Sequence, residues 1–193
     1  MIFRQVLVYL VLVCQLPATA SAGKLRLSPD LKEVIQCDSD TGGKITVLRH
    51  HQIQDTHVYV LRQHGETTGV YPGEEDNSRG SLVSVQCLGS KERLLLISGE
   101  FTSNYMQGLL FRYQPARKKW ERLEFAERER ACLLYLKPEQ MRLVIPNGGY
   151  EAGKYIIVRK FNGKARDTRK LSDGLPKTGG WQVLPVQYPA GLE

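Results

Sequence analysis

The chain has 193 residues, of which 41% are hydrophobic, and its 27 Lys and Arg outnumber 20 Asp and Glu to give a net charge of +7. This length is typical of a single domain with an adequate core. Beyond residue 22, no segment is apolar enough to span a membrane, which excludes the class of integral membrane proteins with helical spans.

The N-terminus has the pattern of a secretory signal peptide. Arg4 precedes an apolar run at 6–16, which is followed by Pro17 and the small residues ATASA. The run is too short to span a bilayer, and the small residues predict cleavage after Ala20 or Ala22. We therefore expect a signal peptide at 1–22, a single domain at 23–193 and a periplasmic location. A buried N-terminal strand or helix is the alternative.

The positive charge favours anionic partners, and export restricts which ones the protein meets. Removing residues 1–22 removes Arg4 alone among the charged residues, so the mature chain stays basic. Export argues against nucleic acid as a partner. Cell-wall polymers, lipid headgroups and acidic proteins are compatible with both properties.

Three cysteines follow the predicted signal peptide. An oxidising compartment favours one disulfide among Cys37, Cys87 and Cys132, with the third thiol free. The sequence leaves the choice of pair open. A zinc site is disfavoured because the chain has no C-x-x-C clip.

The cysteines mark an internal repeat of 45–50 residues. After each cysteine come two apolar runs, and the second contains an arginine 25, 25 and 27 residues beyond the cysteine, at Arg62, Arg112 and Arg159. The runs are short, rich in β-branched and aromatic residues, and bounded by Gly, Pro, Asn and Asp, which predicts strands. The segment at 123–136 favours a helix by composition, but the repeat predicts strands there.

Turn residues complete each predicted repeat of four strands. Asn162-Gly163 is a strong two-residue hairpin signal, and His64-Gly65 and the loop at 115–119 occupy the equivalent place in the other repeats. The charged stretch at 111–130 is then two strands with a solvated edge. The second repeat resembles a kelch-type propeller blade. We predict an all-β, small propeller-like domain, with a β-trefoil and a β-sandwich as alternatives.

Alternating connections would sort the loops to two ends of the domain. One end holds basic turns, and the other holds the segments at 49–57, 99–108 and 146–153. In the first of these, His50, His51 and His57 with Asp55 are conceivable metal ligands. The spacing matches no metal motif, so a solvated loop is the preferred interpretation.

The segment at 99–108 has the composition of a protein-binding surface. It combines aromatic and apolar side chains with small polar ones, and Tyr150 lies in the equivalent loop of the third repeat. Phe101 and Tyr105 packing onto the core is the alternative. The predicted partner-binding residues are Phe101, Thr102, Ser103, Asn104, Tyr105, Met106 and Tyr150.

No catalytic motif is present, so we expect neither an enzyme nor a cofactor. A signal peptide followed by a short propeller-like domain is similar to the periplasmic immunity proteins of type VI secretion peptidoglycan amidase effectors. That resemblance implies an inhibitor that places Ser103 or Asn104 against a catalytic Cys or His. The rival expectation is a cell-wall or carbohydrate binding module in which Trp120 and Trp181 stack on sugars.

Overall fold

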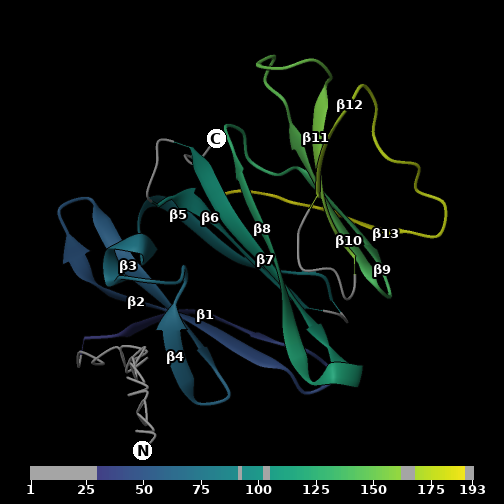
Figure 1. Ribbon diagram of the computed structural model, residues 1–193. Coiled ribbons are helices and arrows are strands. Elements are labelled where there is room, and N and C mark those ends of the chain that lie inside the picture. Colours follow the sequence, from purple (N-terminus) through teal and green to yellow (C-terminus); the bar gives the residue numbers. More distant parts are fainter. Residues whose placement is uncertain (1–29, 91–92, 102–104, 162–167, 190–193) are drawn as a thin grey trace, which may run out of the picture.

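The computed structural model in Figure 1 describes residues 30–90, 93–101, 105–161 and 168–189. These residues form thirteen β-strands and two short 3₁₀ helices, so the predicted all-β class is confirmed. The expected signal peptide and the Asn162-Gly163 turn lie outside the described residues. Within them, no helix is long and apolar enough to cross a bilayer.

Twelve of the strands form three antiparallel meanders of four strands. The first meander is β1 (Lys32–Asp38), β2 (Lys44–Ile53), β3 (Thr56–Gln63) and β4 (Glu66–Gly69). The second is β5 (Arg79–Leu88), β6 (Leu94–Glu100), β7 (Met106–Gln114) and β8 (Lys119–Glu127). The third is β9 (Leu133–Lys137), β10 (Gln140–Pro146), β11 (Tyr155–Phe161) and β12 (Thr168–Ser172). The 3₁₀ helices η1 (Glu75–Ser78) and η2 (Pro115–Arg117) precede β5 and β8.

Two hydrogen-bonded sheets contain these strands. A short pairing between β3 and β5 joins the first two meanders into one eight-stranded sheet. The third meander forms a separate five-stranded sheet, because β13 (Gln182–Pro185) returns to pair with β9. Figure 1 shows β1–β4, β5–β8 and β9–β13 following one another across the molecule. Neither sheet closes into a barrel among the described residues, and the propeller-like arrangement stays a prediction.

Two hydrophobic cores cover the two faces of the second meander. On β6, Leu95 and Ile97 pack in the core with the first meander, whereas Leu94 and Leu96 pack in the core with the third. A strand buried on both faces must be apolar at consecutive positions, which explains the uninterrupted run Leu94-Leu95-Leu96-Ile97. The second meander is therefore the middle layer of the domain.

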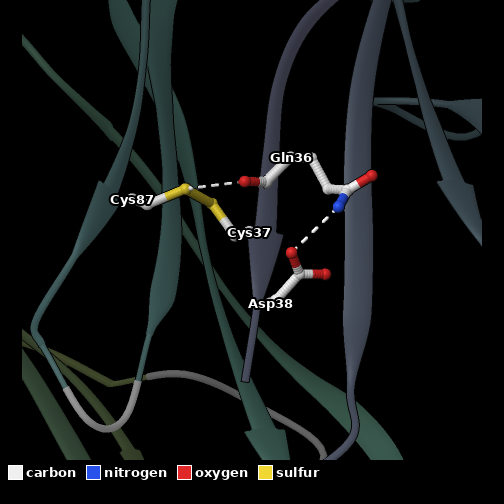
Figure 2. The surroundings of a disulfide bond; sticks show 4 residues. All are labelled: Gln36, Cys37, Asp38 and Cys87. Atoms are coloured by element: carbon white, nitrogen blue, oxygen red, sulfur yellow. Dashed lines mark hydrogen bonds between the residues drawn. A yellow bond between two sulfur atoms is a disulfide. The ribbon is translucent and has the colours of Figure 1, made fainter. Parts of the chain in front are cut away.

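A disulfide links the first two meanders. Cys37 of β1 and Cys87 of β5 are bonded, with their Cα atoms 5.7 Å apart, and Figure 2 shows the bridge between the two strands. Cys87 Sγ also lies 3.5 Å from the carbonyl oxygen of Gln36. Cys132 is the free thiol, as one of the three was expected to be. Burial raises its pKa, so the thiolate form is disfavoured.

Local turn chemistry agrees with the sequence at two predicted positions. His64 and Gly65 both have positive φ, 50° and 82°, and they connect β3 to β4. Such a two-residue turn matches the twist of the flanking strands. In the second meander, Lys118 adopts the left-handed conformation after η2 and returns the chain into β8. The segment at 123–136 contains strand residues of β8 and β9, as the repeat predicts.

Candidate functional site

A surface pocket of about 180 Å³ lies where the second and third meanders meet. The end of β8, the end of β10 and the connection between β10 and β11 contribute to its lining. The lining residues are Tyr105, Glu127, Arg128, Glu129, Pro146, Asn147, Tyr150, Glu151 and Ile156. Two of the predicted partner-binding residues, Tyr105 and Tyr150, therefore share one pocket.

Arg128 joins the two tyrosines. Its Cζ atom lies 5.4 Å from the ring centroid of Tyr105 and 4.3 Å from that of Tyr150, which are cation–π distances. Its Nη2 donates a hydrogen bond to the Tyr105 hydroxyl at 3.4 Å. That hydrogen bond is the main reason the Arg128 pKa is raised above its usual value. We call these three residues the Tyr–Arg–Tyr surface.

Both tyrosines of the Tyr–Arg–Tyr surface are open to solvent. Tyr105 is 44% exposed and Tyr150 is 57% exposed, and both rank among the large hydrophobic side chains that the described fold leaves outside. A tyrosine loses little side-chain entropy when it is fixed, and its ring carries much apolar area. The surface thus presents two aromatic rings and one cation.

A network of charged hydrogen bonds holds two glutamates of the pocket lining in place. Glu127 is buried at the end of β8, where it accepts hydrogen bonds from Arg169 Nε at 2.6 Å and Nη2 at 3.2 Å. Arg169 of β12 also donates to both carboxylate oxygens of Glu151, at 2.6 and 3.1 Å. These hydrogen bonds lower the pKa of Glu151 and raise the pKa of Arg169. The network ties β8, β12 and the loop after β10 into one unit.

The loop that presents Tyr150 is held by a buried asparagine. Asn147 is 2% exposed, and its Nδ2 donates to the carbonyl oxygens of Glu151 at 2.6 Å and Gly153 at 2.7 Å. Gly148 has a φ of 60°, and a Cβ there would come within 2.6 Å of Glu129 Oε1 and 2.7 Å of the Tyr150 ring. Glycine at 148 therefore lets the loop close against the pocket. Asn147 Oδ1, buried in the pocket wall, has no hydrogen-bond donor among the described residues.

The other predicted site residues occupy different positions. Phe101 packs in the core, with its ring 5.0 Å from that of Tyr71 and 6.2 Å from that of Tyr59. It anchors the base of the segment, which is the alternative the sequence left open. Met106 begins β7, is half-buried and pairs with Glu127. Thr102, Ser103 and Asn104 lie outside the described residues.

The interpretation of the histidine segment as a solvated loop is wrong. Residues 44–53 form β2, and a two-residue turn at Gln54-Asp55 leads into β3. One extra residue between Arg49 and Gln52 makes a bulge that contains His50 and His51, and His50 is buried at 5% exposure. His57 Nδ1 lies 3.1 Å from the carbonyl oxygen of His50. In the described part of the chain, no cluster of three His, Cys, Asp or Glu is arranged to hold a metal.

The two tryptophans are engaged within the protein. Trp120 is half-buried against the core of the first two meanders, 5.4 Å from the ring of Tyr113. Trp181 has Arg142 Cζ at 4.0 Å and Lys137 Nζ at 4.7 Å from its ring centroid. Neither ring is an open platform of the kind that the rival carbohydrate-binding expectation requires.

Sequence reasoning did not identify Arg128, Glu127, Asn147 or Arg169 as part of the site. Arg128 was assigned to a solvated strand edge, which is correct for its exposure but not for its contacts. The only local signal was that the segment ends in Glu127-Arg128-Glu129-Arg130, directly before the apolar run of the third repeat. This charged connection joins β8 of the second meander to β9 of the third, so its side chains can contact both layers.

No protein-family model, curated protein or solved structure matches the chain. The chemistry of the pocket therefore carries the functional argument. The described lining contains no His, Cys, Ser or Thr, and two of its three glutamates are hydrogen-bonded to Arg169. Its aromatic rings, exposed guanidinium and buried acceptor are suited to binding.

Proposed function

We propose that the chain is an exported binding protein that inhibits a cell-wall hydrolase, specifically an immunity protein that occludes the active site of a peptidoglycan amidase toxin. The Tyr–Arg–Tyr surface is the proposed contact region. The peptidoglycan amidase is proposed from the architectural resemblance, and the contact region from the geometry of the pocket.

The observation that carries the proposal is Arg128 held between two exposed tyrosines, at 5.4 and 4.3 Å from their rings. Tyrosine and arginine are among the residues most enriched at the energetic centres of protein interfaces. The network of Glu127, Arg169 and Glu151 fixes the elements that carry them, so less freedom is lost on binding.

The disulfide supports export. Cys37 and Cys87 are bonded across two strands, and disulfides persist in oxidising compartments such as the periplasm. An inhibitor of a wall hydrolase would act in that compartment. Periplasmic location is therefore part of the proposal, together with the signal peptide predicted at 1–22.

The test is titration of a purified peptidoglycan amidase with the mature protein, with residual activity as the readout. Arg128→Ala and Tyr150→Ala are each expected to weaken inhibition about 30-fold, which corresponds to about 2 kcal/mol at an interface centre. Tyr105→Phe keeps the ring but loses the hydroxyl that accepts from Arg128, so a smaller effect of about threefold is expected.

Arg62→Ala is the matched control, because Arg62 is exposed on β3 of the first meander and should leave inhibition unchanged. Equal inhibition by wild type, Arg128→Ala and Tyr150→Ala would exclude the Tyr–Arg–Tyr surface. Failure of the wild type to inhibit any member of a panel of wall amidases would reject the proposed function.

A further inference from the structure

The third meander has a second face that carries a row of cations. On β10, Met141, Leu143 and Ile145 point into the core with the second meander, so Arg142 and Val144 lie on the opposite, outer face. Strand pairing places Arg142 beside Arg159 of β11. The transverse row on this face, from β12 to β13, is Thr168, Arg159, Arg142, Tyr135 and Val183.

Trp181 gathers two of the cations on this face. The indole lies with Arg142 Cζ at 4.0 Å and Lys137 Nζ at 4.7 Å from its centroid, and the Tyr135 ring is 6.3 Å away. Lys137 is two residues from Tyr135 along β9, on the same face. One arginine and one lysine thus lie against a single half-buried tryptophan, and Arg159 lies beside Arg142 on the neighbouring strand. We call Lys137, Arg142, Arg159 and Trp181 the outer cation cluster.

The outer cation cluster has no compensating carboxylate among the described residues. Neither Arg142 nor Arg159 forms an ion pair there, and the Nε atoms of both are buried without an acceptor. Like charges directly opposite each other on adjacent strands are destabilising, and a buried donor without a partner adds a further cost. Burial, followed by the charge of Arg159, lowers the pKa of Arg142. An anion placed between the guanidinium groups would offset the like-charge repulsion and would accept charge-assisted hydrogen bonds from them.

A cavity borders the outer cation cluster at Lys137. It has a volume of about 520 Å³ and lies between the β7–β8 connection and the β9–β10 turn. Its described lining contains no Asp or Glu, and it includes Lys137 together with Gly180 and Gln182 on either side of Trp181. Among the described lining residues, the cavity meets the outer cation cluster at Lys137.

We propose that the outer cation cluster binds a phosphate group. Each guanidinium presents a planar fork of donors that matches the oxygens of a phosphate, and the lysine adds a third positive charge. A phosphate carries more negative charge and more acceptor oxygens than a carboxylate, so it matches three cations better. This site is separate from the Tyr–Arg–Tyr surface, and it does not depend on the proposed inhibition.

The experiment follows the two tryptophan indole N–H signals in a ¹H–¹⁵N spectrum during titration with sodium phosphate, with sodium chloride at matched ionic strength as the reference. The Trp181 signal is expected to shift and saturate with phosphate, whereas the Trp120 signal, from the core of the first two meanders, should not move. A second titration with phosphatidylglycerol vesicles, against phosphatidylcholine vesicles, distinguishes a lipid headgroup from a free phosphate. Saturable binding in either form supports the site.

Variants locate the binding. Arg142→Gln/Arg159→Gln should weaken phosphate binding by at least about tenfold, because each lost charge-assisted hydrogen bond is worth more than a factor of ten. Arg142→Lys/Arg159→Lys keeps both charges but loses the planar pair of donors, so an intermediate loss of phosphate affinity is expected. This variant replaces the glutamine variant if the latter does not fold. Arg62→Gln, at an exposed position of β3, should bind as wild type does.

Phosphate should also raise the Tm of the wild type but not that of the glutamine variant. Identical Trp181 shifts with chloride and phosphate would overturn the proposal. Unchanged phosphate affinity in both double variants would overturn it as well. Inhibition of an amidase is not measured in these experiments, so their outcome is independent of the proposed function.

Discussion

Removal of the Cys37–Cys87 disulfide should lower the free energy of unfolding by about 4 kcal/mol. The bridge spans a sequence separation of 50 residues, and it joins β1 to β5 across two meanders. In the chain-entropy estimate, freeing a loop of that length in the unfolded state costs about 4 kcal/mol at 25 °C. The variant is Cys37→Ala/Cys87→Ala, because alanine places no unpaired hydroxyl at the fully buried position 37.

The assay is urea unfolding of the mature protein, followed by tryptophan fluorescence and circular dichroism. The unbridged chain should have a lower midpoint and a larger m-value, because an unfolded chain without the cross-link exposes more surface. Wild type in reducing agent should behave like the double alanine variant. Cys132→Ala is the control, since Cys132 is half-buried and forms no disulfide, and it should retain the bridge and the m-value.

Alkylation of the denatured mature protein gives a direct count, in which Cys132 should be the only thiol to react. Three reactive thiols would refute the bridge itself. A loss of less than about 1 kcal/mol with an unchanged m-value would refute the reasoning that the cross-link constrains the unfolded chain.

Three further predictions concern the third meander and the middle layer. Arg169→Met leaves the carboxylate of Glu127, whose side chain is 9% exposed, without its guanidinium partner, and should lower the free energy of unfolding in urea by about 3 kcal/mol. The double variant Glu127→Met/Arg169→Met should recover most of that loss. The hydrogen bond from Arg169 lowers the pKa of Glu151 below its usual 4.5, so the ionised carboxylate stabilises the fold above that pH. This contribution is lost as the pH falls further. In Glu151→Gln, the free energy of unfolding should therefore fall less steeply with decreasing pH in the acid range. Gly108→Ala should cost about 1 to 3 kcal/mol, because the new Cβ would overlap the Phe125 ring, whereas Gly174→Ala, with open space around it, should be neutral in the same assay.

Several strands were predictable because they meet a simple local rule. The apolar run of β6 indicates a strand buried on both faces, and His64-Gly65 indicates a two-residue turn. The segment at 123–136 shows why the repeat outweighed helix propensity. Its Ala and Glu residues favour a helix in isolation, but Leu123 and Phe125 pack in the core from alternate positions of β8. Tertiary packing decided the secondary structure there.

The prediction of a loop at the histidine segment failed because the sequence pattern does not reveal the β-bulge. Alternation would place His50 and His51 on opposite faces of a regular strand, but one inserted residue between Arg49 and Gln52 changes that register. No Gly or Pro marks this bulge. The local polarity of the segment therefore pointed to a loop where the chain continues as a strand.

The candidate site was half predictable. Tyr105 and Tyr150 follow from their equivalent loops, but their contact with Arg128 depends on how the second meander stacks on the third. The Glu127–Arg169 pair is 42 residues apart in sequence and has no local signature. Such contacts form only after the layers pack, so they were invisible to a search along the chain.

The third meander contributes to both proposed binding regions, and the alternation of β10 separates them. Met141, Leu143 and Ile145 fix the strand against the core, and the same strand ends in the loop that presents Tyr150. Arg142, between two of these core residues, points to the outer face. A substitution at Arg142 should therefore leave the core contacts of its neighbours in place. It should weaken phosphate binding without changing inhibition, and Arg128→Ala should weaken inhibition without changing phosphate binding. Coupling between the two variants would mean that the sheet transmits a change from one face to the other, and the two regions would then form one functional unit.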